Sequence, residues 1–206
     1  MICLFGGTFD PVHLGHLHAA ERVLENLPVA EIRLLLSARP SHKASTGASV
    51  QDRWAMLSAA CAERPGLVAD NREARRNKPS YTVDTLLEFR AEHPKEALTW
   101  VIGSDAYALL PSWYRWEAVL ELANLVVLAR PGPFPTLDPT MSAVTAQHRV
   151  ADLRGCHKGG ILLLEDAMEE VSAAEIRERI AAGATVSHLL PAVVANYIST
   201  HHLYGG

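Results

Sequence analysis

Two histidines and a pair of glycines stand close together near the start of the chain. Residues 6–16 read Gly-Gly-Thr-Phe-Asp-Pro-Val-His-Leu-Gly-His and follow a short apolar run. Because His13 and His16 are three positions apart, they would share one face of the first turn of a helix. Backbone N–H groups and the helix dipole favour an anion there, and imidazolium donors would add to the attraction. The string therefore predicts a phosphate site, although spacing alone also fits metal ligands or two surface histidines.

This phosphate string needs a rigid support, and the apolar runs of the chain predict one. Gly6 and Gly7, which would let the backbone turn tightly and approach a ligand, follow directly on the first run. Continuous apolar runs are typical of strands that are buried on both faces. Six segments fit this pattern, the last two less well than the others: Ile2–Phe5, Ile32–Leu36, Leu98–Ile102, Leu125–Ala129, Ile161–Leu164 and Leu67–Ala69.

Helical patterns lie between these runs. The predicted helices span residues 12–27, a segment that starts at Ser49, and residues 82–89, 114–122, 172–182 and 191–203. Ser49 would cap the second helix and Gly183 would end the fifth, whereas residues 131–140 hold four prolines and indicate a surface loop. Alternating strands and helices imply a parallel sheet with right-handed crossovers. We therefore expect a doubly wound, Rossmann-like α/β fold in a single domain over residues 1–206.

Composition narrows the functional classes. The net charge of −4 argues against a general nucleic-acid or membrane binder, so any positive site must be local. Cys3, Cys61 and Cys156 are widely spaced, without a CxxC pair, and predict free thiols in a reducing cytoplasm. No apolar run approaches the roughly 20 residues of a membrane span. These features predict a cytoplasmic protein but no particular oligomeric state.

Four further segments carry residues suited to nucleotide chemistry. They are Val-Ile-Gly-Ser-Asp at 101–105, Asn-Lys-Pro-Ser-Tyr-Thr-Val-Asp-Thr-Leu at 77–86, Leu-Pro-Ser-Trp-Tyr at 110–114 and Val-Ser-Ala-Ala-Glu-Ile-Arg at 171–177. With residues 6–16, they make nearly the whole chain resemble the bacterial nicotinate-nucleotide adenylyltransferase family of the HxGH nucleotidyltransferases. The resemblance implies transfer of AMP from ATP to nicotinate mononucleotide. The products would be nicotinate adenine dinucleotide and pyrophosphate, formed by direct in-line attack on the α-phosphate.

The resemblance also implies roles for individual residues. The catalytic set around the reacting phosphates would be Thr8, His13, His16 and Arg177, with Mg²⁺ carried on ATP and no metal site on the protein itself. ATP would contact Gly6, Gly7, Thr8, Phe9, His13, His16, Gly103, Asp105, Ser172, Ile176 and Arg177. The helical part from about residue 170 would complete this ATP site. The mononucleotide would contact His42, Lys43, Tyr81, Thr82, Trp113 and Tyr114. Trp113 would stack on the cationic pyridinium ring.

Several alternatives stay open. Ala173 and Ala174 replace hydroxyl residues of the family's motif, so backbone amides and Arg177 would bind more of the phosphate. The acceptor could instead be nicotinamide mononucleotide or phosphopantetheine, although the segments at 77–86 and 110–114 favour a pyridine nucleotide. A non-catalytic nucleotide sensor would keep the same fold. A hydrolase with His13 and His16 as metal ligands would need a third ligand that no spacing indicates.

Overall fold

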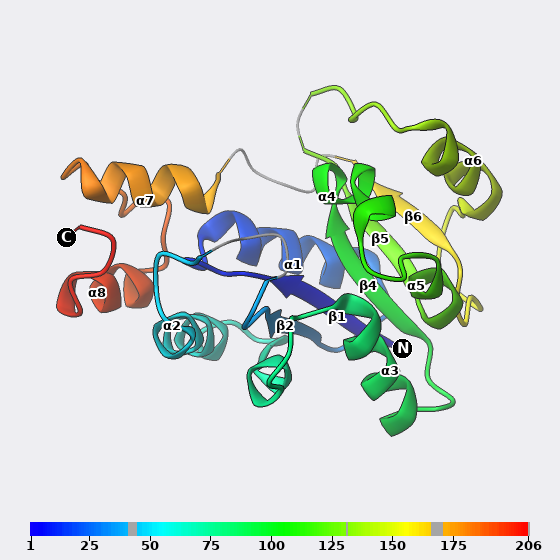
Figure 1. Cartoon of the computed structure of the whole chain (residues 1–206), viewed down its shortest axis with the longest axis horizontal. Helices are drawn as coiled ribbons and strands as arrows, with labels where there is room; N and C mark the ends of the chain where they lie inside the picture. Colours follow the sequence, from blue (N-terminus) through cyan, green and yellow to red (C-terminus); the bar gives the residue numbers. More distant parts are fainter. Residues whose placement is uncertain (41–44, 131, 166–170, 206) are drawn as a thin grey trace.

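Six parallel strands form one central sheet in the computed structural model, which describes residues 1–40, 45–130, 132–165 and 171–205 (Figure 1). The strands lie in the order β3-β2-β1-β4-β5-β6. In chain order they are β1 (Ile2–Gly7), β2 (Ile32–Leu36), β3 (Leu67–Asp70), β4 (Leu98–Gly103), β5 (Asn124–Leu128) and β6 (Ile161–Leu164). Each predicted apolar run is a strand, which confirms the doubly wound α/β fold.

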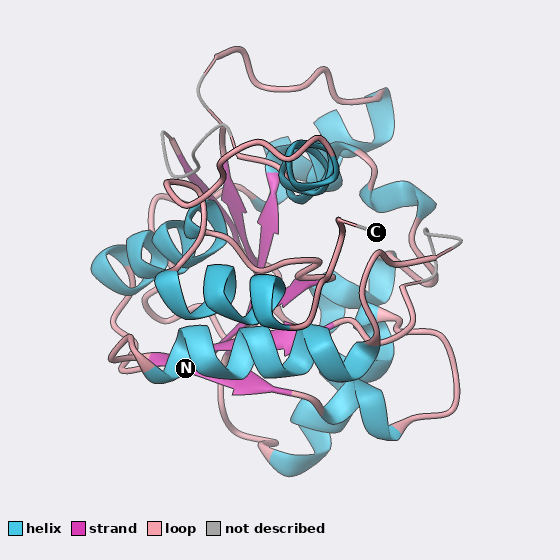
Figure 2. Cartoon of the chain, turned by 90° about the vertical axis from the view of Figure 1, so that its left-hand side faces the viewer, coloured by secondary structure: helices cyan, strands magenta, loops and turns pink. Residues whose placement is uncertain are grey.

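Helices cover both faces of the sheet (Figures 1 and 2). They are α1 (Leu14–Asn26), α2 (Val50–Ala62), α3 (Thr82–Glu92), α4 (Ser104–Ala108), α5 (Glu117–Leu122), α6 (Pro139–His148), α7 (Ala173–Ala181) and α8 (Ala192–Thr200), with 3₁₀ turns at Arg72–Arg75 and Leu110–Ser112. Because strand side chains alternate, Cys3 and Phe5 enter one core with α1, α2, α7 and α8, whereas Leu4 enters a second core with α3 to α6. The sheet is thus buried on both faces.

The strand order creates a switch point beside β1. The chain runs outward from β1 to β2 and β3, then returns to β4 on the other side of β1 and continues to β5 and β6. The carboxyl ends of β1 and β4, which carry Gly6-Gly7 and Gly103, therefore share one edge of the sheet. In sheets of this kind, ligands bind at that edge, beside the switch point.

Several predicted helix boundaries were wrong. The helix predicted over Tyr114–Leu122 starts only at Glu117, because Arg115 has a left-handed φ of 52° and residues 113–116 form a turn. The loop predicted over residues 131–140 ends early, because Asp138 caps α6 by accepting from the Met141 amide at 2.8 Å. Helix α4 was not predicted at all.

Other local expectations were confirmed. Ser49 caps α2 by accepting a hydrogen bond from the Asp52 amide at 3.1 Å. Gly183 follows α7 with a φ of 70°, as a glycine beyond a helix end often does. The three cysteines are free thiols. Among the described residues, no helix is long and apolar enough to cross a membrane.

Candidate active site

The glycine pair at the end of β1 makes room for aromatic rings. A Cβ on Gly6 would lie 2.5 Å from the ring of Trp100, and one on Gly7 would lie 2.7 Å from the ring of Phe9. Both glycines lie within the strand and need no left-handed conformation. The tight turn expected at these glycines is therefore wrong, and the close packing of the two rings requires them instead. The contact of these glycines with ATP stays a prediction.

His13 and His16 stack on one another at the start of α1, on the shared face that their spacing predicts. Their ring centroids are 3.6 Å apart with an angle of 26° between the planes. His13 is the N-cap residue, and its amide donates to Nδ1 of His16 at 3.3 Å. A Cβ on Gly15 would lie 3.2 Å from Nδ1 of His13, so the absence of a side chain there lets the ring lie close. The Leu14 amide donates to the Leu189 carbonyl at 3.0 Å, so this first-turn N–H is already used.

His13 is neutral at pH 7 without a ligand. Its side chain is buried, and this burial, together with the positive charge of Arg130, lowers its pKa from 6.5 to about 4. The imidazolium expected at His13 is therefore absent before an anion binds. A neutral imidazole still donates one hydrogen bond, and an anion beside it would favour the charged form.

Phe9 follows Thr8 in a left-handed conformation. Its φ of 47° is uncommon for a residue with a Cβ, so the surrounding contacts must hold it there. Its ring is 1% exposed and packs edge-on against His16 with centroids 5.0 Å apart. Any contact of Phe9 with ATP would therefore come from its backbone.

A fully buried arginine, Arg53 of α2, lies beneath this turn. Its Nη1 donates to the carbonyls of Thr8 and Ser37, each at 2.8 Å, and its Nη2 donates to the carbonyl of Ala38 at 3.0 Å. Because the peptide bond is planar and trans, a fixed Thr8 carbonyl also fixes the Phe9 N–H, which points the opposite way. Arg53 thus sets the backbone of the phosphate string. The sequence held no sign of this role, because arginine on a helix is usually exposed.

Arg177 of α7 reaches the same turn from the other end of the chain. Its Nη1 donates to the Asp10 carbonyl at 2.7 Å. Ser172, an expected ATP contact, caps α7, since its hydroxyl accepts from the Glu175 amide at 3.1 Å. Ile176 is fully buried, and its amide donates to the Ser172 carbonyl, so neither its side chain nor its N–H faces a ligand.

Asp105 and Arg130 form an ion pair at the edge of the sheet beyond β4 and β5. Asp105 is the second residue of α4, the helix that starts directly after Gly103. Its Oδ2 is 2.9 Å from Nε of Arg130. The Asp105 side chain is 65% exposed, so a ribose hydroxyl can reach it. Arg130, to which the sequence assigned no role, also acts on the pKa of His13. Its charge therefore belongs to the same site as His13 and Asp105.

The residues expected on the mononucleotide side lie on two neighbouring segments. The rings of Tyr81 and Tyr114 are 4.6 Å apart between centroids, and Thr82 is the first residue of α3. Trp113 precedes Tyr114 in the turn before α5 and packs, half-buried, against the second core. The expected contacts His42 and Lys43 lie outside the described residues.

No metal centre is visible in the part of the chain that the structure describes. There, no group of three or more histidine, cysteine, aspartate or glutamate side chains could hold a metal ion. The stacked pair of His13 and His16 therefore gains no third ligand from these residues, and the hydrolase alternative finds no support in them.

A family model described as cytidylyltransferase-like matches residues 4–179. These residues include most of β1, the other five strands, the histidine pair and Arg177. The parallel sheet, the switch point beside β1 and this match together define the class of the protein as nucleotidyltransferase.

Similar proteins narrow the class further. The probable nicotinate-nucleotide adenylyltransferase of Aeromonas salmonicida (strain A449) is 44% identical over 206 residues, which cover 98% of this chain and 96% of that protein. The protein of the same name from Pseudomonas aeruginosa (strain PAO1) is 43% identical over 207 residues, with the same coverage of 98% and 96%. This chain belongs to the nicotinate-nucleotide adenylyltransferase family.

A solved structure supports the fold independently. The Plasmodium falciparum nicotinic acid mononucleotide adenylyltransferase complexed with NaAD matches with a TM-score of 0.77. The match covers 98% of this chain and 96% of that one at 20% sequence identity. At this identity the likeness speaks for the architecture alone.

Proposed function

We propose that this chain transfers AMP from ATP to nicotinate mononucleotide and releases pyrophosphate. The observation that carries the proposal is the stacked pair of His13 and His16 at the N-terminus of α1, beside the switch point of the sheet. Arg177 binds the same turn and brings a positive charge to it. Relatives named as nicotinate-nucleotide adenylyltransferases, 43–44% identical over 98% of the chain, support the choice of acceptor.

The reaction has to bring two polyanions together. Two unit charges 4 Å apart repel each other by about 4 kcal/mol at an effective dielectric near 20. An oxygen of the mononucleotide phosphate would attack the α-phosphorus of ATP in line, and the bond to the pyrophosphate leaving group would break. Thr8, His13, His16 and Arg177 would hold the phosphates and stabilise the charge that develops on them. Mg²⁺ on the ATP phosphates would contribute further positive charge.

The mononucleotide would bind between the start of α3 and the turn before α5. Trp113 would stack on the flat pyridinium ring, and the exposed ring of Tyr114, packed against Tyr81, would extend the aromatic wall. Polar groups near Thr82, at the N-terminus of α3, would accommodate the nicotinate carboxylate. His42 and Lys43, which lie outside the described residues, stay proposed contacts of the mononucleotide.

Pyrophosphate release tests the proposal. The protein is incubated with ATP and Mg²⁺ and, separately, with nicotinate mononucleotide, nicotinamide mononucleotide or phosphopantetheine. We expect the fastest release with nicotinate mononucleotide, whereas faster release with another acceptor would reassign the substrate. ATP binding without pyrophosphate release in the presence of any of the three acceptors would instead support a nucleotide sensor.

A variant of the histidine pair tests the site itself. His16→Ala should keep the fold and lower turnover by about 10²–10³-fold, which is typical for the loss of one preorganised donor. His18→Ala removes an imidazole from the same helix and serves as the control, with turnover close to that of the parent protein. Near-normal turnover of a folded His16→Ala protein would refute the role of the pair.

A further inference from the structure

Four segments that are far apart in the sequence meet at the buried carboxylate of Asp10. The side chain is 2% exposed. Its Oδ2 accepts from the Gly47 amide at 2.7 Å, and its Oδ1 accepts from the Ala48 amide at 3.0 Å. The hydroxyl of Tyr204, in the segment that follows α8, donates to the same Oδ1 at 2.9 Å. Asp10 therefore ties the phosphate string both to the segment before α2 and to residue 204.

Arg177 takes part in this junction. Besides its hydrogen bond to the Asp10 carbonyl, its Nη1 lies 3.8 Å from Oδ2 of the same residue. A Cβ on Gly47 would lie 2.8 Å from Cδ of Arg177 and 2.9 Å from Cε1 of Tyr204. The aliphatic stem of Arg177 and the ring of Tyr204 thus press against the same glycine. The ring and the stem therefore lie close to one another on this side of the phosphate string.

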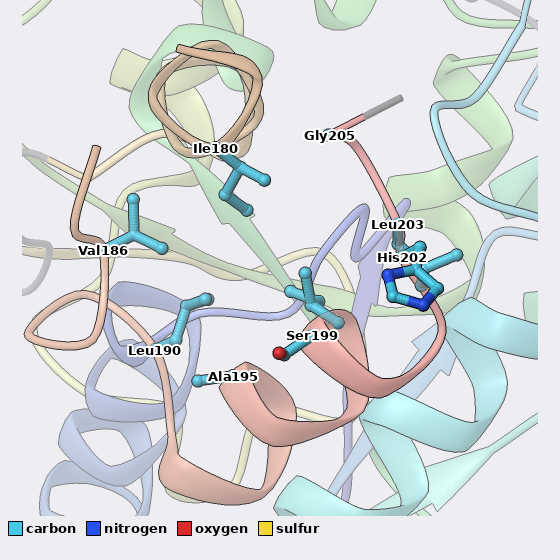
Figure 3. A pocket seen from close by; sticks show the side chains of 9 residues that line it. Ile180, Val186, Leu190, Ala195, Ser199, His202, Leu203 and Gly205 are labelled. Carbon is cyan, nitrogen blue, oxygen red and sulfur yellow. The ribbon is translucent and has the colours of Figure 1, made fainter. Parts of the chain in front are cut away.

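The segment that carries Tyr204 is held in a strained conformation. His202 and Tyr204 have φ values of 51° and 65°, a region that residues with a Cβ seldom adopt. A cavity of about 360 Å³ lies beside this segment, lined by His202, Leu203 and Gly205 together with residues of α7 and α8 (Figure 3). Strain of this kind persists only where other contacts fix the chain. The hydrogen bond from Tyr204 to Asp10 is such a contact.

We propose that Tyr204 is a positioning residue for the ATP site and that it acts through Arg177. The hydroxyl anchors the segment to Asp10, and the ring confines the arginine stem so that the guanidinium stays at the phosphate turn. This inference rests on the proposed function, because it takes Arg177 as a ligand of the ATP phosphates. Tyr204 itself contacts Asp10 and Gly47 and does not need to touch the substrate.

The first test compares two tyrosine hydroxyls. Tyr204→Phe should lower kcat/KM for ATP about tenfold, the effect of one hydrogen bond to a charged group, and leave KM for the mononucleotide unchanged. Tyr197→Phe is the control, because the Tyr197 hydroxyl also donates to an aspartate, Oδ1 of Asp52 at 3.1 Å, but in a partly buried place between α8 and α2. Tyr197→Phe should leave both kcat/KM for ATP and KM for the mononucleotide unchanged. Equal losses in the two variants, or parallel rises in both KM values, would overturn the inference.

The second test asks whether Tyr204 acts through Arg177. In an Arg177→Ala background, the tyrosine substitution should cause no further loss, because the group that it positions is gone. Losses that multiply in the double variant would show that Tyr204 acts by another route and would overturn the inference.

The third test separates this inference from the proposed function. ATP–Mg²⁺ binding is measured by calorimetry on the full chain without any acceptor. Tyr204→Phe should bind ATP several-fold more weakly than Tyr197→Phe even if no acceptor supports transfer. Equal ATP affinities of the two variants would refute the positioning role of Tyr204. Weaker ATP binding by Tyr204→Phe, in a protein that transfers no AMP to nicotinate mononucleotide, would refute only the proposed acceptor.

Discussion

Replacement of Arg53 by methionine should lower the free energy of unfolding by more than a surface substitution does. The guanidinium makes three hydrogen bonds of 2.8, 2.8 and 3.0 Å to backbone carbonyls in a fully buried place. Methionine fills most of the same volume but leaves these three carbonyls without their donor. An unpaired buried carbonyl costs about 1–3 kcal/mol, and loss of one partner of a buried charged network typically costs about 3–5 kcal/mol. We expect the free energy of unfolding to fall by about 4 kcal/mol.

Urea unfolding followed by circular dichroism measures this change. Arg64→Met is the control, because Arg64 follows the same helix and pairs with Glu21 at the surface, where such a pair contributes at most about 1 kcal/mol. Arg53→Lys keeps the charge but donates from a single nitrogen, so its free energy of unfolding should fall by about half as much. This variant allows the test even if Arg53→Met does not fold. A loss below about 1 kcal/mol for Arg53→Met, equal to that of the control, would refute the role assigned to Arg53.

Two further predictions concern His13 and the mononucleotide side. Because the folded protein lowers the pKa of His13 from 6.5 to about 4, the unfolded chain binds its proton first, so stability should fall by about 3 kcal/mol between pH 6.5 and pH 4. Urea unfolding at several pH values in this range gives the free energy of unfolding as a function of pH. That free energy should change less with pH in His13→Gln than in the parent protein, and an equal change in both would contradict the lowered pKa. Trp113→Ala should raise KM for nicotinate mononucleotide by about 3–30-fold, the range of a cation–π contact, and leave KM for ATP nearly unchanged. An unchanged KM for the mononucleotide would disprove the stacking role.

Local sequence patterns predicted most of the fold. The bounds of β2 and β6 match the predicted runs, because strands buried on both faces are continuous apolar segments. The helix before β5 starts three residues later than the apolar pattern predicts, since a left-handed turn at Arg115 does not change that pattern. The loop predicted over residues 131–140 overlaps the first turn of α6, because the proline of that turn stands at the first helical position, where it is tolerated.

In the candidate site, too, contacts between residues close in the sequence were predictable, whereas contacts between distant residues were not. The three-residue spacing of His13 and His16 predicted the helix face that they share, but not the stacking of their rings. The buried contacts of Asp10, by contrast, join it to residues 37 to 194 positions away. Neither residue type nor local spacing encodes such a meeting, which depends on how the sheet brings the segments together. The contact of Arg53 with the Thr8 carbonyl, 45 positions away, likewise leaves no local pattern, and arginine on a helix is usually exposed.

The junction at Asp10 also constrains when the protein can become functional during its synthesis. β1 and the phosphate string are made first, but the tyrosine that binds their aspartate comes 194 positions later. Contacts of this sequence separation form late, and ribosomes add only about 5–20 residues per second. A nascent chain therefore carries its histidine pair for roughly ten seconds or more before the arginine and tyrosine reach it. Nucleotide affinity should appear late in translation, after the last helix and residue 204 have left the ribosome.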